Sequence, residues 1–418
     1  MTADGSSAGS RAPRPVFIGG RWVESRSSAT RGVEDPTTRT VLAEIVESGA
    51  ADVALACAAA REAHAHWRRT RASDRAVALN AVAAAVRAAS ETLATTLTAE
   101  SGRPIRETRE EVAAAARWLE EAAPRITATD ASVDRGSPAA VVAVAGGFDR
   151  PIGAFLEAAG AALGAGAALI CKPPVEAPLS SLQLVDAFAS LPAGLVNVVT
   201  GGAATVEALV ASGAVDRLRF DGSDEECAAL RRIGGCAVER VGPIESITGV
   251  VDEHADLERA AAEAARAGLR AAGQCVTPRV RLVVQRCVAA AFADQLHVHV
   301  AFLEVGDPRK PDTDLGPLIS HAAVRRAEEQ VARALQAGAR LKLGGRAFNP
   351  WGLAGHFFQP TILTDVPRGS AAALAEFRAP VLSLVAFEDA PDLAAALASQ
   401  PGAVRRLGAV DPAATTPR

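Results

Sequence analysis

The strongest candidate for a nucleophile in this sequence is a cysteine in a turn. Cys275 lies in the segment GQCVTP, residues 273–278, between a predicted helix and a predicted strand. A thiolate in an accessible turn can attack a carbonyl carbon and form a covalent intermediate. A single cysteine is more often a small buried hydrophobic residue, so the turn alone leaves both interpretations open.

Two charged residues stand near the ends of predicted strands. Lys172 follows the apolar run 168–171, and ligands of doubly wound sheets bind at the carboxyl ends of the parallel strands. A solvated strand end explains Lys172 equally well. Glu239 stands shortly before Gly242 at the junction with a second α/β segment, where a lone glutamate is more often solvated than catalytic.

A glycine at one junction between a predicted strand and a predicted helix could help to hold a phosphate group. The sequence has no G-x-x-x-x-G-K-[ST] motif, but Gly222 and Ser223 stand between a predicted strand and a predicted helix. The free N–H groups of a helix N-terminus bind anions. Serine at this position is more often a simple N-cap, and the acidic residues 224–226 that follow compete with an incoming anion.

The sequence argues against a metal site and against one class of dehydrogenase. None of the seven histidines forms an H-E-x-x-H pattern, and the six cysteines contain no C-x-x-C pair. We therefore expect no metal site. The chain has no tyrosine, which excludes the short-chain dehydrogenases that depend on a Tyr-x-x-x-Lys pair.

The elements that must position these residues are short apolar strands alternating with helices. After residue 136 we predict strands at 140–144, 168–171, 195–199 and 218–220. This alternation is typical of βαβ units in a parallel, doubly wound sheet, the architecture of nucleotide-binding domains. A second α/β segment begins near Val241. The predicted fold class is therefore α/β.

The part before residue 136 is predicted to be a hairpin followed by helices. The segment VFIGGRWV, residues 16–23, places two glycines between two short apolar runs, which indicates a tight turn. Alanine-rich segments with helical periodicity then predict helices at 52–67, 73–89 and 104–123.

Charge and hydropathy exclude several classes of function. The chain carries 44 Lys and Arg against 48 Asp and Glu, a formal net charge of −4, without the basic excess of a nucleic-acid-binding protein. Its apolar runs contain glycine and are too short for a membrane span, and its start lacks a signal-peptide core. The cysteines show no disulfide-like spacing. We expect a cytoplasmic protein that binds neither nucleic acid nor membranes.

A series of short motifs resembles the aldehyde dehydrogenase superfamily from residue 17 to about residue 397. In chain order they are FIGGRW (17–22), ESGRP (100–104), CKP (171–173), FDGS (220–223), GDP to GPLI (306–319), QPT (359–361) and EFRAP (376–380). Any one of them is weak, but the ordered series is specific. The resemblance implies a doubly wound dinucleotide-binding domain and a second α/β catalytic domain.

The resemblance also implies roles for individual residues. Cys275 would attack the aldehyde, and Glu239 would activate water to hydrolyse the resulting thioester. The cofactor, NAD or NADP, would be held by Lys172 at the adenine-side ribose, by Gly222 and Ser223 at the pyrophosphate, and by Glu376 at the nicotinamide ribose. The carboxylate that the family often uses on the adenosine ribose falls on Val175, so the choice between the two cofactors stays open.

Two departures from the family pattern fall on the reacting centre. The asparagine that donates its amide to the oxyanion is replaced by Asp149, and an ionised carboxylate would repel the developing negative charge. The cysteine register is also ambiguous. Matching the CVTP segment places Cys275 at the nucleophile position, whereas matching GQ without a gap places Val276 there. We favour Cys275, because turns absorb deletions more easily than strands.

Other departures concern length. The family's bridging hairpin is shortened to residues 127–137, and its last catalytic strands and oligomerisation tail have no counterpart, which leaves the oligomeric state open. We predict tails at 1–14 and 410–418. Between them we predict an NAD(P)-binding domain at 15–238 and a truncated thiol domain at 239–409.

The leading hypothesis is an NAD(P)-dependent oxidoreductase that converts an aldehyde to a carboxylic acid through a Cys275 thiohemiacetal and thioester. The alternative is a catalytically impaired paralogue that binds a dinucleotide, or a full-length relative, without turnover. A third reading is a related thiol reductase that acts on acyl phosphates or thioesters.

Overall fold

The computed structural model describes residues 13–129, 139–241, 247–274, 280–370, 373, 377–398 and 403–409. The chain forms two compact units. Unit 1 comprises residues 1–35, 40–96 and 109–241, and unit 2 comprises residues 36–39, 97–108 and 242–418. Two short segments from the first part of the chain therefore belong to the second unit, which the sequence did not indicate. Except for residues 13 and 14, both predicted tails lie outside the described residues.

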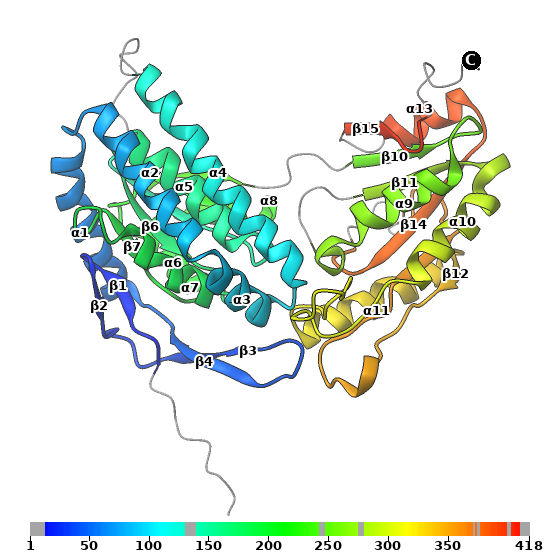
Figure 1. Ribbon diagram of the computed structural model, residues 1–418, viewed down its shortest axis with the longest axis horizontal. Helices are drawn as coiled ribbons and strands as arrows, with labels where there is room; N and C mark the ends of the chain where they lie inside the picture. Colours follow the sequence, from blue (N-terminus) through cyan, green and yellow to red (C-terminus); the bar gives the residue numbers. More distant parts are fainter. Residues whose placement is uncertain are drawn as a thin grey trace, which may run out of the picture. The chain divides into compact units, whose positions relative to one another are not determined.

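Unit 1 contains a seven-stranded sheet in the order β2-β1-β7-β6-β5-β8-β9 (Figure 1). Its strands are β1 (Val16–Ile18), β2 (Arg21–Val23), β5 (Val141–Ala145), β6 (Ala168–Lys172), β7 (Val196–Val198), β8 (Arg217–Phe220) and β9 (Ala237–Arg240). From β7 to β9 all neighbours are parallel. Strands β5 and β6 are buried along their whole length, because continuous apolar runs suit a sheet covered on both faces. The predicted α/β fold with a doubly wound parallel sheet is confirmed.

Helices cover both faces of this sheet. They are α1 (Ala50–Trp67), α2 (Ala72–Ala88), α5 (Pro151–Gly164), α6 (Leu179–Leu184), α7 (Ala203–Ala211) and α8 (Asp224–Ile233). The strand order runs from β5 toward β7 in one direction and toward β9 in the other, so right-handed crossovers put α5 and α6 on one face and α7 and α8 on the opposite face. Helix α1 packs against α7, and α2 packs against α5.

The predicted two-glycine hairpin is present. Strands β1 and β2 pair antiparallel, and the turn places Gly19 and Gly20 at φ values of 64° and 78°, which glycine adopts without strain. A separate two-stranded sheet joins β3 (Thr30–Glu34) and β4 (Val41–Val46).

The long helical region of the first part of the chain differs from the prediction. Helix α3 (Ser90–Ser101) follows α2, and α4 (Ile105–Thr129) continues beyond the predicted end at residue 123. It passes through Pro124, so this proline does not end the helix. Both α3 and α4 contribute residues to each unit.

Unit 2 contains a six-stranded sheet in the order β12-β13-β14-β11-β10-β15. Its strands are β10 (Ile247–Val251), β11 (Val280–Gln285), β12 (Arg340–Leu343), β13 (Thr361–Thr364), β14 (Val381–Phe387) and β15 (Ala403–Arg406). Its helices are α9 (Leu257–Gly268), α10 (Arg286–Ala301), α11 (His321–Gln336) and α13 (Ala390–Ala398). All strand pairs are parallel except β12 with β13.

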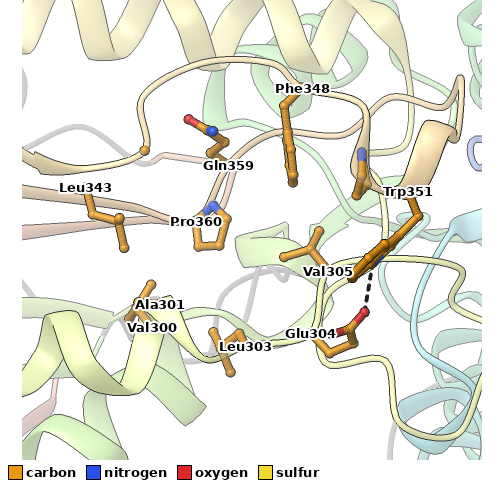
Figure 2. Close-up of a pocket in the computed structure, with 12 residues that line it drawn as sticks. Val300, Ala301, Leu303, Glu304, Val305, Leu343, Phe348, Trp351, Gln359 and Pro360 are labelled. Carbon is orange, nitrogen blue, oxygen red and sulfur yellow. Dashed lines mark hydrogen bonds between the residues drawn. The ribbon is translucent and has the colours of Figure 1, made fainter.

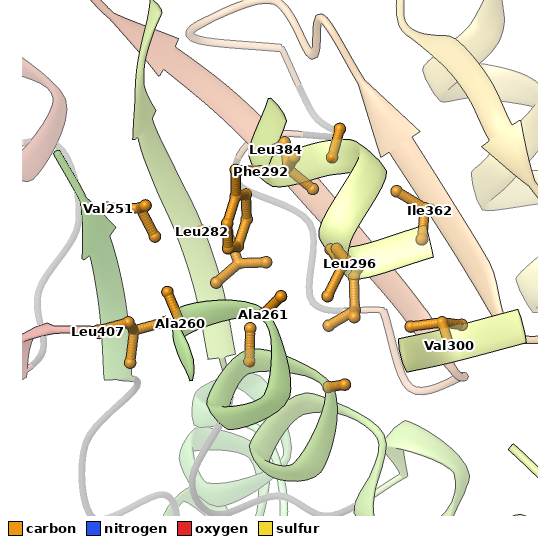
Figure 3. Close-up of a cluster of buried hydrophobic side chains, with 14 of the residues drawn as sticks. Val251, Ala260, Ala261, Leu282, Phe292, Leu296, Val300, Ile362, Leu384 and Leu407 are labelled. Atoms are coloured by element: carbon orange, nitrogen blue, oxygen red, sulfur yellow. The ribbon is translucent and has the colours of Figure 1, made fainter. Parts of the chain in front are cut away.

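The core of unit 2 lies between its sheet and two helices. Figure 3 shows alanines of α9 and larger side chains of α10 facing the strands. Phe292 and Leu296 of α10 are buried with Leu282 of β11 and Leu384 of β14. The small side chains of Ala260 and its neighbours on α9 let this helix approach the sheet closely. The alanines of this segment therefore form one apolar face of α9.

Candidate active site

Five of the seven residues with a predicted role can be placed, and all five lie in unit 1. They are Asp149, Lys172, Gly222, Ser223 and Glu239. Cys275 and Glu376 lie outside the described residues, so the roles predicted for them stay predictions.

Lys172 ends β6 at the carboxyl edge of the sheet, in register with Ala145 at the end of β5. Only 7% of this residue is exposed. Burial lowers the pKa of Lys172, while the carboxylates of Glu176 and Glu47 act in the opposite direction. A buried ammonium group at this edge is not a solvated strand end, and it lies where parallel sheets bind ligands.

The surroundings of Lys172 include a residue that the sequence analysis missed. Glu47, just after β4, accepts the N–H of Gly202 at 2.7 Å and forms an ion pair with Arg31. Burial acts to raise the pKa of Glu47, but these hydrogen bonds and the charges of Arg31 and Lys172 outweigh it and lower the pKa. Glu47 is far from Lys172 in the sequence, so no local pattern could have linked them.

The ends of β5 and β8 bring two carboxylates to one glycine. A Cβ atom added to Gly147 would lie 2.8 Å from Oδ1 of Asp149 and 2.5 Å from Oδ2 of Asp221. Asp149 is only 3% exposed. The residue predicted to replace the amide is therefore a buried carboxylate, with a second carboxylate nearby. Asp221 belongs to the FDGS motif, in which only Gly222 and Ser223 have a predicted role.

Ser223 is the N-cap of α8, and its polar groups already have partners. Its hydroxyl accepts the N–H of Glu226 at 3.1 Å, and its own N–H donates to the Glu226 carboxylate at 2.7 Å. This reciprocal pair is a capping box. A phosphate group could take the N–H of Ser223 only after the Glu226 carboxylate moves away. Arg240 lies close by and donates to the carbonyl oxygen of Gly222 at 3.1 Å.

Glu239 lies within β9, opposite Arg219 of β8. Its side chain is 44% exposed and forms an ion pair with Arg217, the residue two positions earlier on β8. The ion pair engages one oxygen of the Glu239 carboxylate and leaves the other as an acceptor. The role of Glu239 as a base stays a prediction.

In unit 2, the residue before Cys275 is firmly held. Gln274 is 2% exposed. Its side-chain oxygen accepts the N–H of Ile319, in the GPLI motif, at 2.8 Å. The two motifs ESGRP and GPLI also touch, since a Cβ atom on Gly316 would lie 1.8 Å from the carbonyl oxygen of Gly102. Motifs that are far apart in the sequence thus form one packed assembly ahead of the predicted nucleophile.

Unit 2 also has a cavity of about 460 Å³ near the end of α10. Figure 2 shows Phe348 and Trp351 lining it together with aliphatic side chains. The indole N–H of Trp351 donates to the Glu304 carboxylate at 2.9 Å, and 80% of this tryptophan is exposed. None of the five described residues with a predicted role lines this cavity.

The described residues contain no group of three or more His, Cys, Asp or Glu side chains that could hold a metal ion. Within the same part of the chain, no single helix is long and apolar enough to cross a bilayer, although α2 and α3, bent by 67° at their junction, together pass the test of length and composition.

Comparison with known proteins identifies relatives along most of the chain. The succinate-semialdehyde dehydrogenase [NADP(+)] of Escherichia coli is 33% identical over 401 residues, which cover 91% of this chain and 82% of that protein. The glutarate-semialdehyde dehydrogenase of Pseudomonas putida is 32% identical over the same length, with the same coverage of both chains.

The chain is also similar to solved structures along most of its length. An NADP-dependent enzyme of E. coli superimposes with a TM-score of 0.84 at 31% identity, covering 92% of this chain and 82% of that one. Aldehyde dehydrogenase C of Pseudomonas syringae, in complex with NAD⁺ and octanal, gives 0.85 at 26% identity, covering 92% and 81%. A sequence model described as the Aldehyde dehydrogenase family matches residues 22–401. The chain belongs to the aldehyde dehydrogenase family.

Proposed function

We propose that this member of the family oxidises an aldehyde to a carboxylic acid, with NAD⁺ or NADP⁺ as hydride acceptor and Cys275 as nucleophile. The observation that carries the proposal is the buried Lys172 at the carboxyl edge of β6, in a chain that matches the family over residues 22–401. We assign cofactor binding to residues 15–238 and the thiol to residues 239–409.

The chemistry follows from the thiol. The Cys275 thiolate attacks the carbonyl carbon, a C–S bond forms, and the carbonyl oxygen takes the electron pair. A bound dinucleotide would supply the acceptor for the hydride of that carbon, and the oxyanion would then re-form the carbonyl group of a Cys275 thioester. Water, deprotonated by Glu239, then attacks the thioester. The C–S bond breaks, the carboxylic acid leaves, and the thiol is restored.

The residues of unit 1 fit the ribose of the cofactor as they stand, whereas binding of the pyrophosphate would require a side chain to move. Lys172 is a buried hydrogen-bond donor suited to ribose hydroxyl groups. Gly222 and Ser223 would hold the pyrophosphate once Glu226 releases the N–H of Ser223. Glu376 would hold the nicotinamide ribose.

For the substrate, we infer an aldehyde that carries an anionic group at its other end. The relatives named above act on succinate semialdehyde and glutarate semialdehyde, and a 3-sulfolactaldehyde dehydrogenase of Pseudomonas putida is 33% identical over 391 residues. All three aldehydes bear a carboxylate or a sulfonate. Semialdehydes should therefore be turned over in preference to neutral aldehydes of the same length.

A second candidate function rests on Asp149. A buried carboxylate in the place of the oxyanion-binding amide favours a protein that binds the dinucleotide with little or no turnover. The two functions differ in turnover and not in stabilisation by the dinucleotide. A ligand stabilises the protein that binds it through mass action, whether or not a reaction follows.

The test combines turnover with ligand-induced stabilisation. Formation of NADH or NADPH is followed with succinate semialdehyde, glutarate semialdehyde and butanal, for the wild type and for Cys275→Ala. We expect Cys275→Ala to abolish turnover. Cys287→Ala is the matched control, because Cys287 is an exposed cysteine on α10. In Glu239→Gln we expect a burst of reduced cofactor followed by slow release of acid.

The outcomes separate the candidates. Turnover that persists in Cys275→Ala rejects the thiol mechanism. A chain that shows no turnover but unfolds at a higher temperature with NAD⁺ or NADP⁺ supports the second candidate. Loss of that thermal shift in Lys172→Met would place the dinucleotide at β6.

A further inference from the structure

The turn that leads into residue 275 has an unusual backbone. Ala271 and Ala272 have φ values of 48° and 53°, and Gly273 follows at 69°. Three successive residues therefore lie in the left-handed region, which is unfavourable for the two alanines. Such a conformation persists only where the surrounding structure determines it.

One side chain from another segment and one from the turn itself fix this turn. Glu107, in the first turn of α4, accepts the N–H of Ala271 at 3.0 Å through Oε2. Gln274 closes the turn by donating from Nε2 to the carbonyl oxygen of Ala271 at 3.1 Å, while its oxygen accepts from Ile319. Gly273 packs against the backbone of Ala379 and leaves no room for a side chain, since a Cβ atom on Gly273 would lie 2.0 Å from the carbonyl oxygen of Ala379.

The Glu107 carboxylate is held in place despite its burial. Glu107 is 6% exposed, and Arg103, one turn earlier, lies 3.9 Å from it with its side chain also buried. A carboxylate removed from water is costly unless it is paired and hydrogen-bonded. Here the N–H that its Oε2 accepts belongs to the strained residue Ala271, so this hydrogen bond links the buried carboxyl group to the turn.

We infer that Glu107 and Gln274 are positioning residues for the thiol site. They hold residues 271–274 in the conformation from which the chain continues to Cys275. The inference rests on the proposed role of Cys275 as nucleophile. It gives a role to Glu107, which follows the ESGRP motif and takes no part in the proposed reaction.

The test compares two variants of Glu107. Glu107→Ala removes the acceptor for the Ala271 N–H, whereas Glu107→Gln keeps an oxygen that can accept it. Small displacements of a reacting group can cost up to about a hundredfold in rate. We expect Glu107→Ala to lower kcat about tenfold or more, with the KM for the cofactor within about twofold of the wild type. Glu107→Gln should retain most of kcat.

A second measurement does not need turnover. The rate of alkylation of Cys275 by iodoacetamide is determined by mass spectrometry of its peptide, with exposed Cys287 as the internal reference. Glu107→Ala should change the Cys275 rate severalfold and leave the Cys287 rate unaltered. Gln274→Met, which removes both side-chain hydrogen bonds, should give the same signature if Glu107→Ala does not fold.

A matched control exists on the same helix. Glu111 of α4 is also a buried carboxylate, and it accepts the backbone N–H groups of Ile152 and Gly153 at 3.1 and 3.0 Å. Glu111→Gln should leave the alkylation rate of Cys275 at the wild-type value.

Three results would overturn the inference. They are an unchanged Cys275 alkylation rate in both Glu107→Ala and Gln274→Met, a parallel change at Cys287, or the same change in Glu111→Gln. If the wild type shows no turnover, the proposed function fails, but a selective change in Cys275 alkylation would still support the positioning role.

Discussion

At the scale of single residues, the carboxyl edge of the unit 1 sheet combines a buried lysine with a buried aspartate. Lys172 ends β6, and Asp149 lies close to the neighbouring end of β5. A family site that stabilises an oxyanion needs a hydrogen-bond donor there, and a deprotonated aspartate has none. If Asp149 takes the predicted place beside the oxyanion, the identity of this one side chain should strongly affect how fast the chain turns over an aldehyde.

We predict that Asp149→Asn raises kcat, because it restores an amide donor and removes a negative charge. One oxyanion donor is worth about 10²–10³ in rate, so the gain should approach that range. Asp149→Ala, which removes the charge without supplying a donor, should give a smaller gain. Steady-state kinetics with the preferred aldehyde measure both variants, and a fall in kcat for Asp149→Asn would contradict the prediction.

Glu107 makes the stability of the chain depend on pH. Burial raises the pKa of Glu107, and the charges of Arg103, Arg270 and Arg106 oppose this shift without cancelling it. A carboxyl group whose pKa is raised in the folded state contributes stability that is complete below its ordinary value of 4.5 and is lost as the pH rises through the raised pKa.

Glu107→Gln removes this titration. The free energy of unfolding of the variant, relative to the wild type, should therefore increase as the pH rises above about 4.5 and then level off. Urea unfolding at a series of pH values between about 4 and 8 measures the difference. A difference that stays constant over this range would show that the Glu107 carboxyl group is not perturbed.

At the scale of elements, two predicted roles of the N-terminus of α8 conflict, namely the capping of the helix and the binding of a pyrophosphate. The capping box formed by Ser223 and Glu226 satisfies free N–H groups of the helix. The same N–H groups are the ones that a pyrophosphate would need. Asp224 and Glu225 add two further negative charges to this turn.

We predict that Glu226→Gln tightens cofactor binding. Glutamine can preserve the capping box, so the helix should stay intact while one charge is removed from the first turn. A charge at a helix terminus is worth about 0.3–1 kcal/mol, which corresponds to a roughly two- to fivefold lower Kd for NAD⁺ or NADP⁺. Calorimetric titration measures the Kd, and Glu225→Gln, outside the capping box, controls for the general effect of charge. Weaker binding in Glu226→Gln would indicate that the pyrophosphate does not lie at α8.

At the scale of the whole molecule, the sequence predicted the repeating elements better than the packing between distant segments. The buried strands β5 and β6 were recognisable as continuous apolar runs, and the β1–β2 hairpin was recognisable from its two glycines. These signals are local. The assignment of residues 36–39 and 97–108 to unit 2 was not predictable, because it depends on contacts that have no local pattern.

The same distinction holds for the candidate site. Lys172 and Ser223 were found because each stands where a strand ends or a helix begins. Glu47, Glu107 and Asp221 were missed, because a charged residue in the sequence is expected on the surface. Only tertiary contacts bury Glu107 and bring the partly buried Glu47 and Asp221 to the edge of the sheet. The register of Cys275 against Val276 lies outside the described residues and stays a prediction.

The acidic first turn of α8 has a consequence for how binding responds to ionic strength. Anion sites lined by lysine and arginine weaken when salt is added, because the attraction is screened. A pyrophosphate bound at this turn would be repelled by residues 224–226, although Arg240, which pairs with Asp224 at 3.1 Å, offsets part of their charge. Dissolved ions should screen that repulsion as well. Cofactor affinity should therefore change little between dilute buffer and concentrated sodium chloride, or even improve.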